Sequence, residues 1–448
     1  MKPSSSKKIP LTVIMLGFVS LFTDIATEMI YPLIPVYVSA LGAGAIILGV
    51  IEGLAETTAA MLKLISGIIS DKLNKRKFLV FIGYSISTIA RPFTGLVSAA
   101  WQIVPVRITD RIGKGIRTAP RDALIASSVE PSIRGKAYGF HRAMNHAGAV
   151  VGPLLAILAL LLLVLGLNMK YPLHVLRWIF ILSIIPGCLS ILTIIFFVKE
   201  TVPQPQTSKR FTFSLKDFDR NFINYLFILI LFTLGNSSDV FLLFRVEESL
   251  RKSGAMINLV NRIGPVHEML LIFGSAENQS QLINLLFLPL IWSFFHIIKV
   301  IFSTPLSALS DRIGRRRTIS IGWAIYAFVY ISFALIVFLP SSVQIIATFV
   351  LFAVYALYYA FSEGAEKAFV ADIVKEEKRG SAFGMYNFAI GLGVLPASLI
   401  FGFLYSYFNS LIPGFGGTVA FGFGGVLAVV SLVLLLTVVK ERSLTKVK

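Results

Sequence analysis

Long runs of apolar residues follow one another along almost the whole chain, and short polar segments separate them. A helix needs about 20 such residues to cross the hydrocarbon core of a membrane, which is roughly 30 Å thick. The runs predict an all-α membrane protein with 12 transmembrane helices. The predicted spans are residues 11–38, 42–66, 78–99, 101–126, 137–166, 173–198, 221–244, 282–308, 318–339, 343–371, 381–408 and 418–439.

The composition agrees with this class, because 56% of the 448 residues are hydrophobic and only 14% are charged. The net charge of +18 would also fit nucleic-acid binding, so the positions of the cations matter. The tails, the central linker and the loops between spans 2–3, 4–5, 8–9 and 10–11 hold 25 of the 41 lysines and arginines, and the opposite loops hold 6. By the positive-inside rule both termini are cytoplasmic. We predict a multi-pass protein of the cytoplasmic (inner) membrane, embedded in the lipid bilayer as a monomer, with no nucleic-acid partner.

Cysteine usage and the N-terminus narrow the chemistry further. Cys188 is the only cysteine, so neither a disulfide framework nor a cysteine metal site can form within the chain. The apolar run after the short basic start lacks a small-residue cleavage pattern, and we interpret it as the first helix and not as a removable signal. The sequence contains no His-Glu-x-x-His metal motif and no serine elbow. We therefore expect no metal, no cofactor and no enzymatic activity.

Three short segments recur in the same order at nearly constant spacing, each time on the predicted cytoplasmic side. This repetition predicts two pseudo-symmetric six-helix bundles with the same orientation, at residues 1–198 and 221–448, joined by a flexible cytoplasmic linker at 199–220. Ser70–Lys77 recurs as Ser310–Arg317 at an offset of 240, Arg134–Gly139 recurs as Arg379–Gly384 at 245, and Val198–Glu200 recurs as Val439–Glu441 at 241.

A second irregular stretch, at residues 245–281, lies on the predicted outer side between spans 7 and 8. Its segment Met256–Phe273 has an amphipathic pattern that would suit a helix on the membrane surface or over the pore. Because Gly264 and Pro265 interrupt this pattern, we favour a plain long loop.

The first repeated segment resembles the signature of the loop between helices 2 and 3 in major facilitator superfamily transporters. Asn74 and Ser307 depart from the family pattern, since each stands where the family usually has glycine. The resemblance implies that the aspartate pairs with cations at neighbouring helix ends and holds the cytoplasmic side shut. The gate residues implied are Gly67, Asp71 and Arg76 in the first half and Asp311, Arg312, Gly314 and Arg315 in the second.

Span 5 carries Gly139, Gly148, Gly152 and Pro153 in the spacing Gly-x8-Gly-x3-Gly-Pro. This spacing is similar to the helix-5 motif of the proton-coupled exporters in the superfamily, although Ala156-Ile157 replaces the Gly-Gly that ends it. Glycines four residues apart allow two helix backbones to approach closely, and proline kinks a helix. The resemblance implies antiport, and the alternative is helix packing without a transport role.

Ionisable residues inside the spans each cost about 2.5–3.5 kcal/mol on insertion scales, so each needs a partner or a function. Two carboxylate pairs have a spacing of four, which places both members on one helix face. The predicted proton-coupling residues are Asp24, Glu28, Glu52 and Glu56, with Asp24 and Glu52 favoured by their depth.

Span 4 bears a cationic stripe that we expect to face a cavity or opposing carboxylates. The stripe consists of Arg107, Arg111, Lys114, Arg117 and Arg121. The predicted substrate or cavity residues are Arg107, Asp110, Arg111, Arg142, Asp239, His296, Lys299 and Glu363. The alternative for each of these groups is neutralisation by its neighbours without any substrate contact.

Together these observations favour a secondary active transporter that moves a small molecule by alternating access, with protons as the coupling ion and export as the direction. The span 4 stripe motivates an alternative, which is proton-coupled uptake of an organic anion such as a carboxylate, sugar phosphate or siderophore. A membrane enzyme or sensor is disfavoured because no catalytic motif or appended soluble domain is present.

Overall fold

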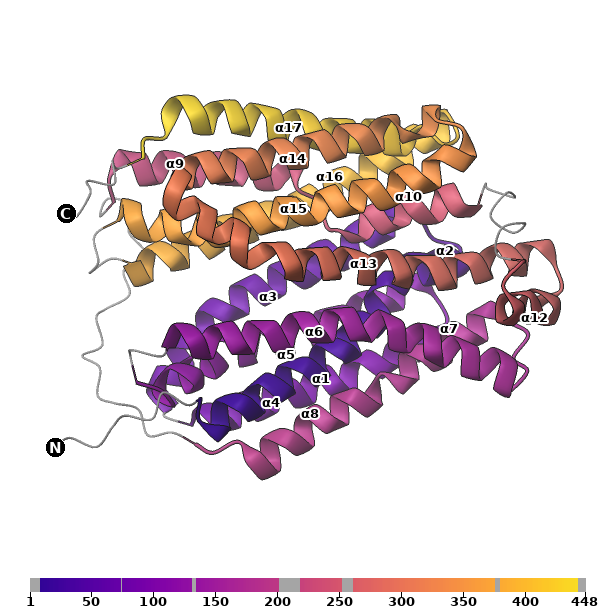
Figure 1. Ribbon diagram of the computed structural model, residues 1–448, viewed down its shortest axis with the longest axis horizontal. Helices are drawn as coiled ribbons and strands as arrows, with labels where there is room; N and C mark the ends of the chain where they lie inside the picture. Colours follow the sequence, from indigo (N-terminus) through magenta and orange to yellow (C-terminus); the bar gives the residue numbers. More distant parts are fainter. Residues whose placement is uncertain are drawn as a thin grey trace.

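The computed structural model describes residues 9–73, 75–130, 134–200, 218–251, 261–374 and 379–441. These residues are almost entirely helical, and they form two bundles that lie one above the other in Figure 1. In that view α1 begins and α17 ends at the same end of the molecule, which we call the termini end.

The first bundle contains six membrane-crossing segments, several of which are built from two consecutive helices. Its elements are α1 (Leu11–Ile30), η1 (Tyr31–Leu33), α2 (Ile34–Ala40), α3 (Ala45–Leu73), α4 (Arg76–Ala90), η2 (Arg91–Leu96), η3 (Ala100–Gln102), α5 (Ile103–Ser127), α6 (Arg134–Leu161), η5 (Leu162–Gly166), α7 (Pro172–Leu182) and α8 (Ile184–Phe197).

The second bundle repeats this plan. Its elements are α9 (Arg220–Gly235), α10 (Val240–Arg251), α12 (Gly264–Phe273), α13 (Ala276–Ile313), α14 (Arg315–Leu335), η7 (Ile336–Phe338), α15 (Ser341–Ile373), α16 (Arg379–Leu411) and α17 (Gly416–Val438). Most of the predicted linker at 199–220 lies outside the described residues.

Ten of the described crossings are long and apolar enough to span a membrane. The other two are α4 with η2, whose α-helical part is 15 residues long, and the charged helix α5. Both lie inside the first bundle, where α5 packs between α3 and α4. The predicted twelve-helix fold is confirmed, and α5 crosses with its charges because its neighbours cover them.

Several predicted spans are interrupted in the structure, and two of them, the first and the seventh, contribute to the candidate site. The first changes from α1 to α2 through the 3-10 turn η1, where Pro32 and Pro35 remove backbone donors. The seventh stops at Gly235 and resumes at Val240, and the four residues between are polar. Neither interruption was predicted, because the hydrophobic pattern presents each of these two spans as continuous.

The outer segment also differs from its prediction. Residues 252–260 lie outside the described part of the chain, but Gly264–Phe273 forms the helix α12 and not a loop. Pro265 occupies the first turn of that helix, where its missing N–H would have no partner in any case. The Gly-Pro pair therefore starts the helix that we expected it to prevent.

The bundles contact each other along two seams, α3 with α16 and α6 with α13. Small residues bring α3 and α16 together toward the end opposite the termini, since a Cβ on Gly402 would lie 2.7 Å from Ala45 O. In the other seam, Ser293 Oγ of α13 donates to Val150 O of α6 at 2.8 Å. The candidate site lies between these seams.

Candidate functional site

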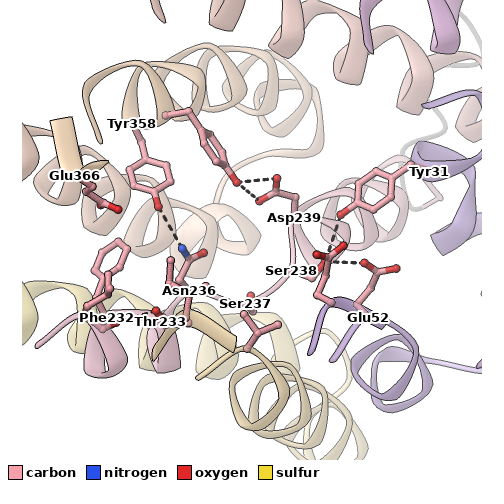
Figure 2. Close-up of a pocket in the computed structure, with 15 residues that line it drawn as sticks. Tyr31, Glu52, Phe232, Thr233, Asn236, Ser237, Ser238, Asp239, Tyr358 and Glu366 are labelled. Atoms are coloured by element: carbon pink, nitrogen blue, oxygen red, sulfur yellow. Dashed lines mark hydrogen bonds between the residues drawn. The ribbon is translucent and has the colours of Figure 1, made fainter. Parts of the chain in front are cut away.

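The two interrupted spans meet at the boundary between the bundles, and each contributes a hydroxyl group to the contact. Tyr31 Oη of η1 lies 3.2 Å from Ser238 Oγ, which belongs to the gap between α9 and α10. The Ser238 hydroxyl lies 3.3 Å from Glu52 Oε2 of α3. Figure 2 shows these three side chains converging from both bundles. Paired interruptions in matching helices of two repeats are a strong structural pointer to a transport site.

A cavity of about 350 Å³ opens beside this contact. Three of the predicted site residues line it, namely Glu52, Glu56 and Asp239. The other lining residues were not predicted, because all but one are neutral and leave no charge signal; the exception, Glu366, is an ionisable residue of span 10 that was not placed among the site residues. The remaining lining residues are Tyr31, Leu229, Phe232, Thr233, Asn236, Ser237, Ser238, Tyr358, Tyr359, Glu366, Ile390 and Val394.

Asp239 is the last residue of the gap before α10, and tyrosines of α15 bind it. Tyr355 Oη donates to Asp239 Oδ1 at 2.6 Å, and Tyr359 Oη lies 2.9 Å from Oδ2. Glu366 is similarly held by Trp323 Nε1 at 2.9 Å and by Tyr386 Oη at 2.7 Å. All of these donors are neutral. Neither carboxylate forms an ion pair with a cation in the described part of the chain.

The carboxylates opposite α5 have the other kind of environment. Arg107 Nη2 contacts Glu52 Oε1 at 2.7 Å, and Arg111 Nε contacts Glu56 Oε1 at 2.8 Å. Asp110 lies on α5 itself and contacts Arg111 Nη1 at 3.0 Å. Arg107, Asp110 and Arg111 are almost fully buried. The predicted cationic stripe thus faces carboxylates, and none of its residues appears among those that line the cavity.

Asp24 and Glu28 of α1 receive hydrogen bonds from neutral groups. Asn145 of α6 donates to Asp24. Trp292 Nε1 of α13 donates to Glu28 Oε2 at 2.7 Å, across the boundary between the bundles. Neither carboxylate forms an ion pair with a described cation. The structure therefore separates the four predicted proton-coupling residues into an arginine-bound pair, Glu52 and Glu56, and a pair with neutral partners.

Two glycines of the helix-5 motif allow α6 to pack closely against α1. A Cβ on Gly148 would lie 2.9 Å from Asp24 Cβ, and one on Gly152 would lie 2.9 Å from Glu28 Cβ. Gly139, by contrast, has no atom within 4 Å of such a Cβ. Pro153 follows Gly152 inside α6. Two of the three glycines thus pack directly behind the carboxylates with neutral partners.

A second charged group joins the bundles nearer the termini end. Arg142 of α6 forms an ion pair with Glu363 of α15, and Lys299 Nζ of α13 lies 3.8 Å from Glu363 Oε2. The predicted residue His296 is buried in the same seam against Trp292. Neither of its ring nitrogens has a hydrogen-bond partner in the described part of the chain. None of these four predicted residues lines the cavity.

The predicted gate residues lie at the termini end. The side chain of Asp71, like position Gly67, falls outside the part of the structure that is described, and Arg76 Nη1 donates to Ala123 O at 3.4 Å. In the second half, Arg315 pairs with Asp311 and with Asp372, the latter at 3.2 Å. These contacts stay within one bundle.

The glutamates that end the two copies of the third repeated segment, Glu200 and Glu441, form hydrogen bonds in the same region. Glu200 Oε2 accepts from Lys77 N at 2.9 Å, and Glu441 accepts from the backbone N–H of Arg315. Each glutamate thus caps the start of the third helix of its bundle, α4 or α14. Gly314, which precedes α14, has φ +97°, a conformation that a side chain disfavours. Arg312 is exposed.

Comparisons with known proteins agree with this architecture. A family model described as Major Facilitator Superfamily matches residues 16–264 and 253–448. An uncharacterized MFS-type transporter of Methanocaldococcus jannaschii is 32% identical over 433 residues, which are 96% of each chain. The multidrug resistance protein MdtG of Proteus mirabilis is 27% identical over 156 residues, which are 34% of this chain and 38% of that relative.

Solved structures with the same fold include a mutant form of the nucleoside transporter NupG. It matches with a TM-score of 0.73 at 14% identity over 94% of this chain and 99% of that one. A D-xylose-proton symporter matches with a TM-score of 0.65 at 16% identity over 96% of this chain and 98% of that one. At these identities the likeness concerns the fold alone.

Proposed function

The chain belongs to the major facilitator superfamily, and from this membership we propose that it is a proton-coupled antiporter that exports a small molecule from the cytoplasm. As a member of this family it is a multi-pass membrane transporter and not an enzyme. The observation that best supports coupling is the pair of α1 carboxylates, Asp24 and Glu28, which are bound by neutral donors beside a seam that must move. The domain plan is two bundles, residues 1–198 and 221–448, that rock about the cavity.

The proton-binding role follows from the contrast between two kinds of carboxylate. An arginine partner supplies a fixed countercharge to a buried carboxylate, as Arg107 does for Glu52. A carboxylate with neutral hydrogen-bond partners has no cation in direct contact, so it can be neutral in one state and ionised in another. We therefore favour Asp24 and Glu28 as proton carriers and assign Glu52 and Glu56 to a fixed network with α5.

Glu28 is also placed to connect protonation to movement. Its partner Trp292 belongs to the opposite bundle, so this hydrogen bond must break or rearrange when α13 moves relative to α1. Gly152 packs against the backbone of α1 at the same level. A change in the charge of Glu28 therefore acts directly at the boundary between the bundles.

Export is supported by the helix-5 motif and by the multidrug resistance relative, which matches about a third of the chain. The alternative of organic anion uptake rested on the cationic stripe of span 4. Because Arg107 and Arg111 face carboxylates and do not line the cavity, the described geometry does not favour that alternative.

Reconstitution into proteoliposomes tests the proposal. A compound library is first screened for ligands that raise the apparent melting temperature of the purified protein, since ligand binding stabilises the folded state. Flux of each ligand is then measured with an imposed pH gradient and, separately, as exchange at equal pH. We expect a pH gradient to drive uphill transport by the native protein.

Substitution of Asp24 and Glu28 tests whether these residues carry the proton. Asp24→Asn or Glu28→Gln should abolish pH-driven transport and leave exchange largely intact, because exchange needs alternating access but no net proton movement. Glu277→Gln, at an exposed site in the first turn of α13, is the matched control and should behave like the native protein. Full pH-driven transport by both carrier variants would show that the assignment to α1 is wrong.

A further inference from the structure

The charge of the cavity lining is strongly one-sided. Four carboxylates line it, and none of the described lining residues is lysine, arginine or histidine. Two of the carboxylates, Glu52 and Glu56, are neutralised from behind by arginines of α5. The other two, Asp239 and Glu366, have only neutral hydrogen-bond donors. When these two are ionised, the cavity holds negative charge that no described lining residue balances.

Asp239 is fixed in position but not neutralised. Tyr355 and Tyr359 orient its carboxylate from α15, with oxygen–oxygen distances of 2.6 and 2.9 Å. A cation, Lys299, approaches this group from outside the cavity, with Nζ 4.1 Å from the ring centre of Tyr359. That lysine lies 3.8 Å from Glu363 Oε2, and Glu363 is not a lining residue. Lys299 therefore contacts a carboxylate outside the cavity, which it shares with Arg142 and Lys367.

Glu366 provides a second anionic position. In Figure 2 Glu366 and Asp239 lie on opposite sides of Tyr358. Trp323 and Tyr386 each donate to one oxygen of Glu366, so both oxygens keep a lone pair for a further donor. Glu366 is 7% exposed, which means that a ligand donor would bind it in a largely water-free environment.

Aromatic rings form much of the remaining wall. Tyr31, Phe232, Tyr358 and Tyr359 line the cavity, and faces of such rings attract cations. Asn236 and Ser238 supply neutral hydrogen-bonding groups from the gap in the seventh span. The volume of about 350 Å³ is at the small end of the range for organic ligands.

We infer that this cavity is a binding site for a protonated organic amine, with its ammonium group at Asp239 or Glu366 and its apolar or aromatic body against Tyr358 and Phe232. The inference rests on the proposed function in that it takes the cavity as the transport site. An anionic ligand would meet carboxylates without a lining cation. A neutral ligand would leave both buried carboxylates without a countercharge.

Two sets of probes with matched shapes test this inference on the purified full-length protein. The first set is phenethylamine, 2-phenylethanol and 3-phenylpropanoate, and the second is hexylamine, 1-hexanol and heptanoate. Binding is measured as the shift in apparent melting temperature and by calorimetric titration at pH 7. We expect each amine to bind, and the alcohol and the acid of its set to bind at least about tenfold more weakly.

Two variants locate the ammonium group. Asp239→Asn and Glu366→Gln keep the shape of the side chain, and at least one of them should weaken amine binding about tenfold or more. Asp219→Asn is the matched control, because Asp219 caps α9 outside the cavity and asparagine caps equally well. It should bind amines like the native protein.

The outcomes separate this inference from the proposed function. If the amines bind no better than the alcohols and acids, including the case in which no probe binds, the inference is overturned. It is also overturned if neither cavity variant weakens amine binding. If the amines bind as expected but no pH gradient drives their flux, amine recognition stands and the proposal of proton-coupled export fails.

Discussion

Alanine substitutions at the glycines of α6 offer a test in which one helix supplies both the perturbation and its control. A Cβ on Gly148 would lie 2.6 Å from Leu21 O, and one on Gly152 would lie 2.8 Å from Ile25 O. Both distances are well inside van der Waals contact. The atoms that would be struck belong to the α1 backbone, so they cannot move aside by rotating a side chain.

The magnitude follows from two opposing terms. Overpacking a close contact costs about 1–3 kcal/mol, whereas alanine is a better helix former than glycine by up to about 1 kcal/mol. Gly148→Ala and Gly152→Ala should therefore each destabilise the protein by about 1–2 kcal/mol. Gly139→Ala lies in the same helix with no atom within 4 Å of the added carbon. It should be neutral or stabilising by up to about 1 kcal/mol.

Unfolding in mixed micelles, with sodium dodecyl sulfate titrated into dodecyl maltoside, measures the three free-energy differences under identical conditions. Transport by the same variants shows whether the α1–α6 contact also affects function. Two results would refute the steric argument. One is equal destabilisation by Gly139→Ala and Gly152→Ala, and the other is unchanged stability in both Gly148→Ala and Gly152→Ala.

Two further predictions concern ion pairs of different burial. Arg107→Gln should destabilise the protein by about 3–5 kcal/mol, because it leaves the buried Glu52 without its cation. The double variant Arg107→Gln with Glu52→Gln should recover a large part of this loss. Equal losses of stability in the single and the double variant would contradict the pairing. Arg142→Gln should change stability by less than about 1 kcal/mol, since the Arg142–Glu363 pair is partly exposed. The same variant should nevertheless raise the labelling rate of single cysteines placed around the cavity, because a link between the bundles is lost, and an unchanged labelling rate would contradict that role.

Much of the fold could be predicted because the membrane imposes strong constraints on sequence. Spans must be apolar and about 20 residues long, and basic loops alternate across the bilayer. Helix α5 illustrates the strength of these rules. Its composition argues against a membrane crossing. The basic loops before span 3 and after span 4 both belong on the cytoplasmic side, so the chain must cross twice between them. The structure places α5 between α3 and α4.

The site was harder to predict because its defining features leave little trace in hydropathy. Pro32 and the polar residues Asn236 and Ser238 were visible in the sequence, but each is common in membrane helices. Only the structure shows that the two interruptions face each other. The relevant signal would have been a polar gap at matching depth in the first helix of each half.

Charge alone also could not distinguish structural from functional groups, because the distinction depends on partners. Glu52 and Asp24 are both acidic residues at mid-depth in the first half, and both were predicted as proton carriers. One contacts an arginine, while the other receives a hydrogen bond from an amide. The partner is set by how α1 and α3 are rotated within the bundle, and hydrophobic periodicity cannot resolve that rotation where charged and apolar residues share a face.

The partition of carboxylates finally suggests why a membrane protein retains so many charges in one bundle. The arginines of α5 bind Glu52 and Glu56 tightly, which gives the first bundle a rigid charged core behind the cavity. Under the proposed function, changes of charge are confined to carboxylates that have neutral partners, in α1 on one side and at Asp239 on the other. If an amine binds at Asp239 while a proton binds on α1, the two ligands occupy different carboxylates within the boundary between the bundles. Their coupling would then arise from the shared conformational equilibrium of the bundles and not from competition for a single group.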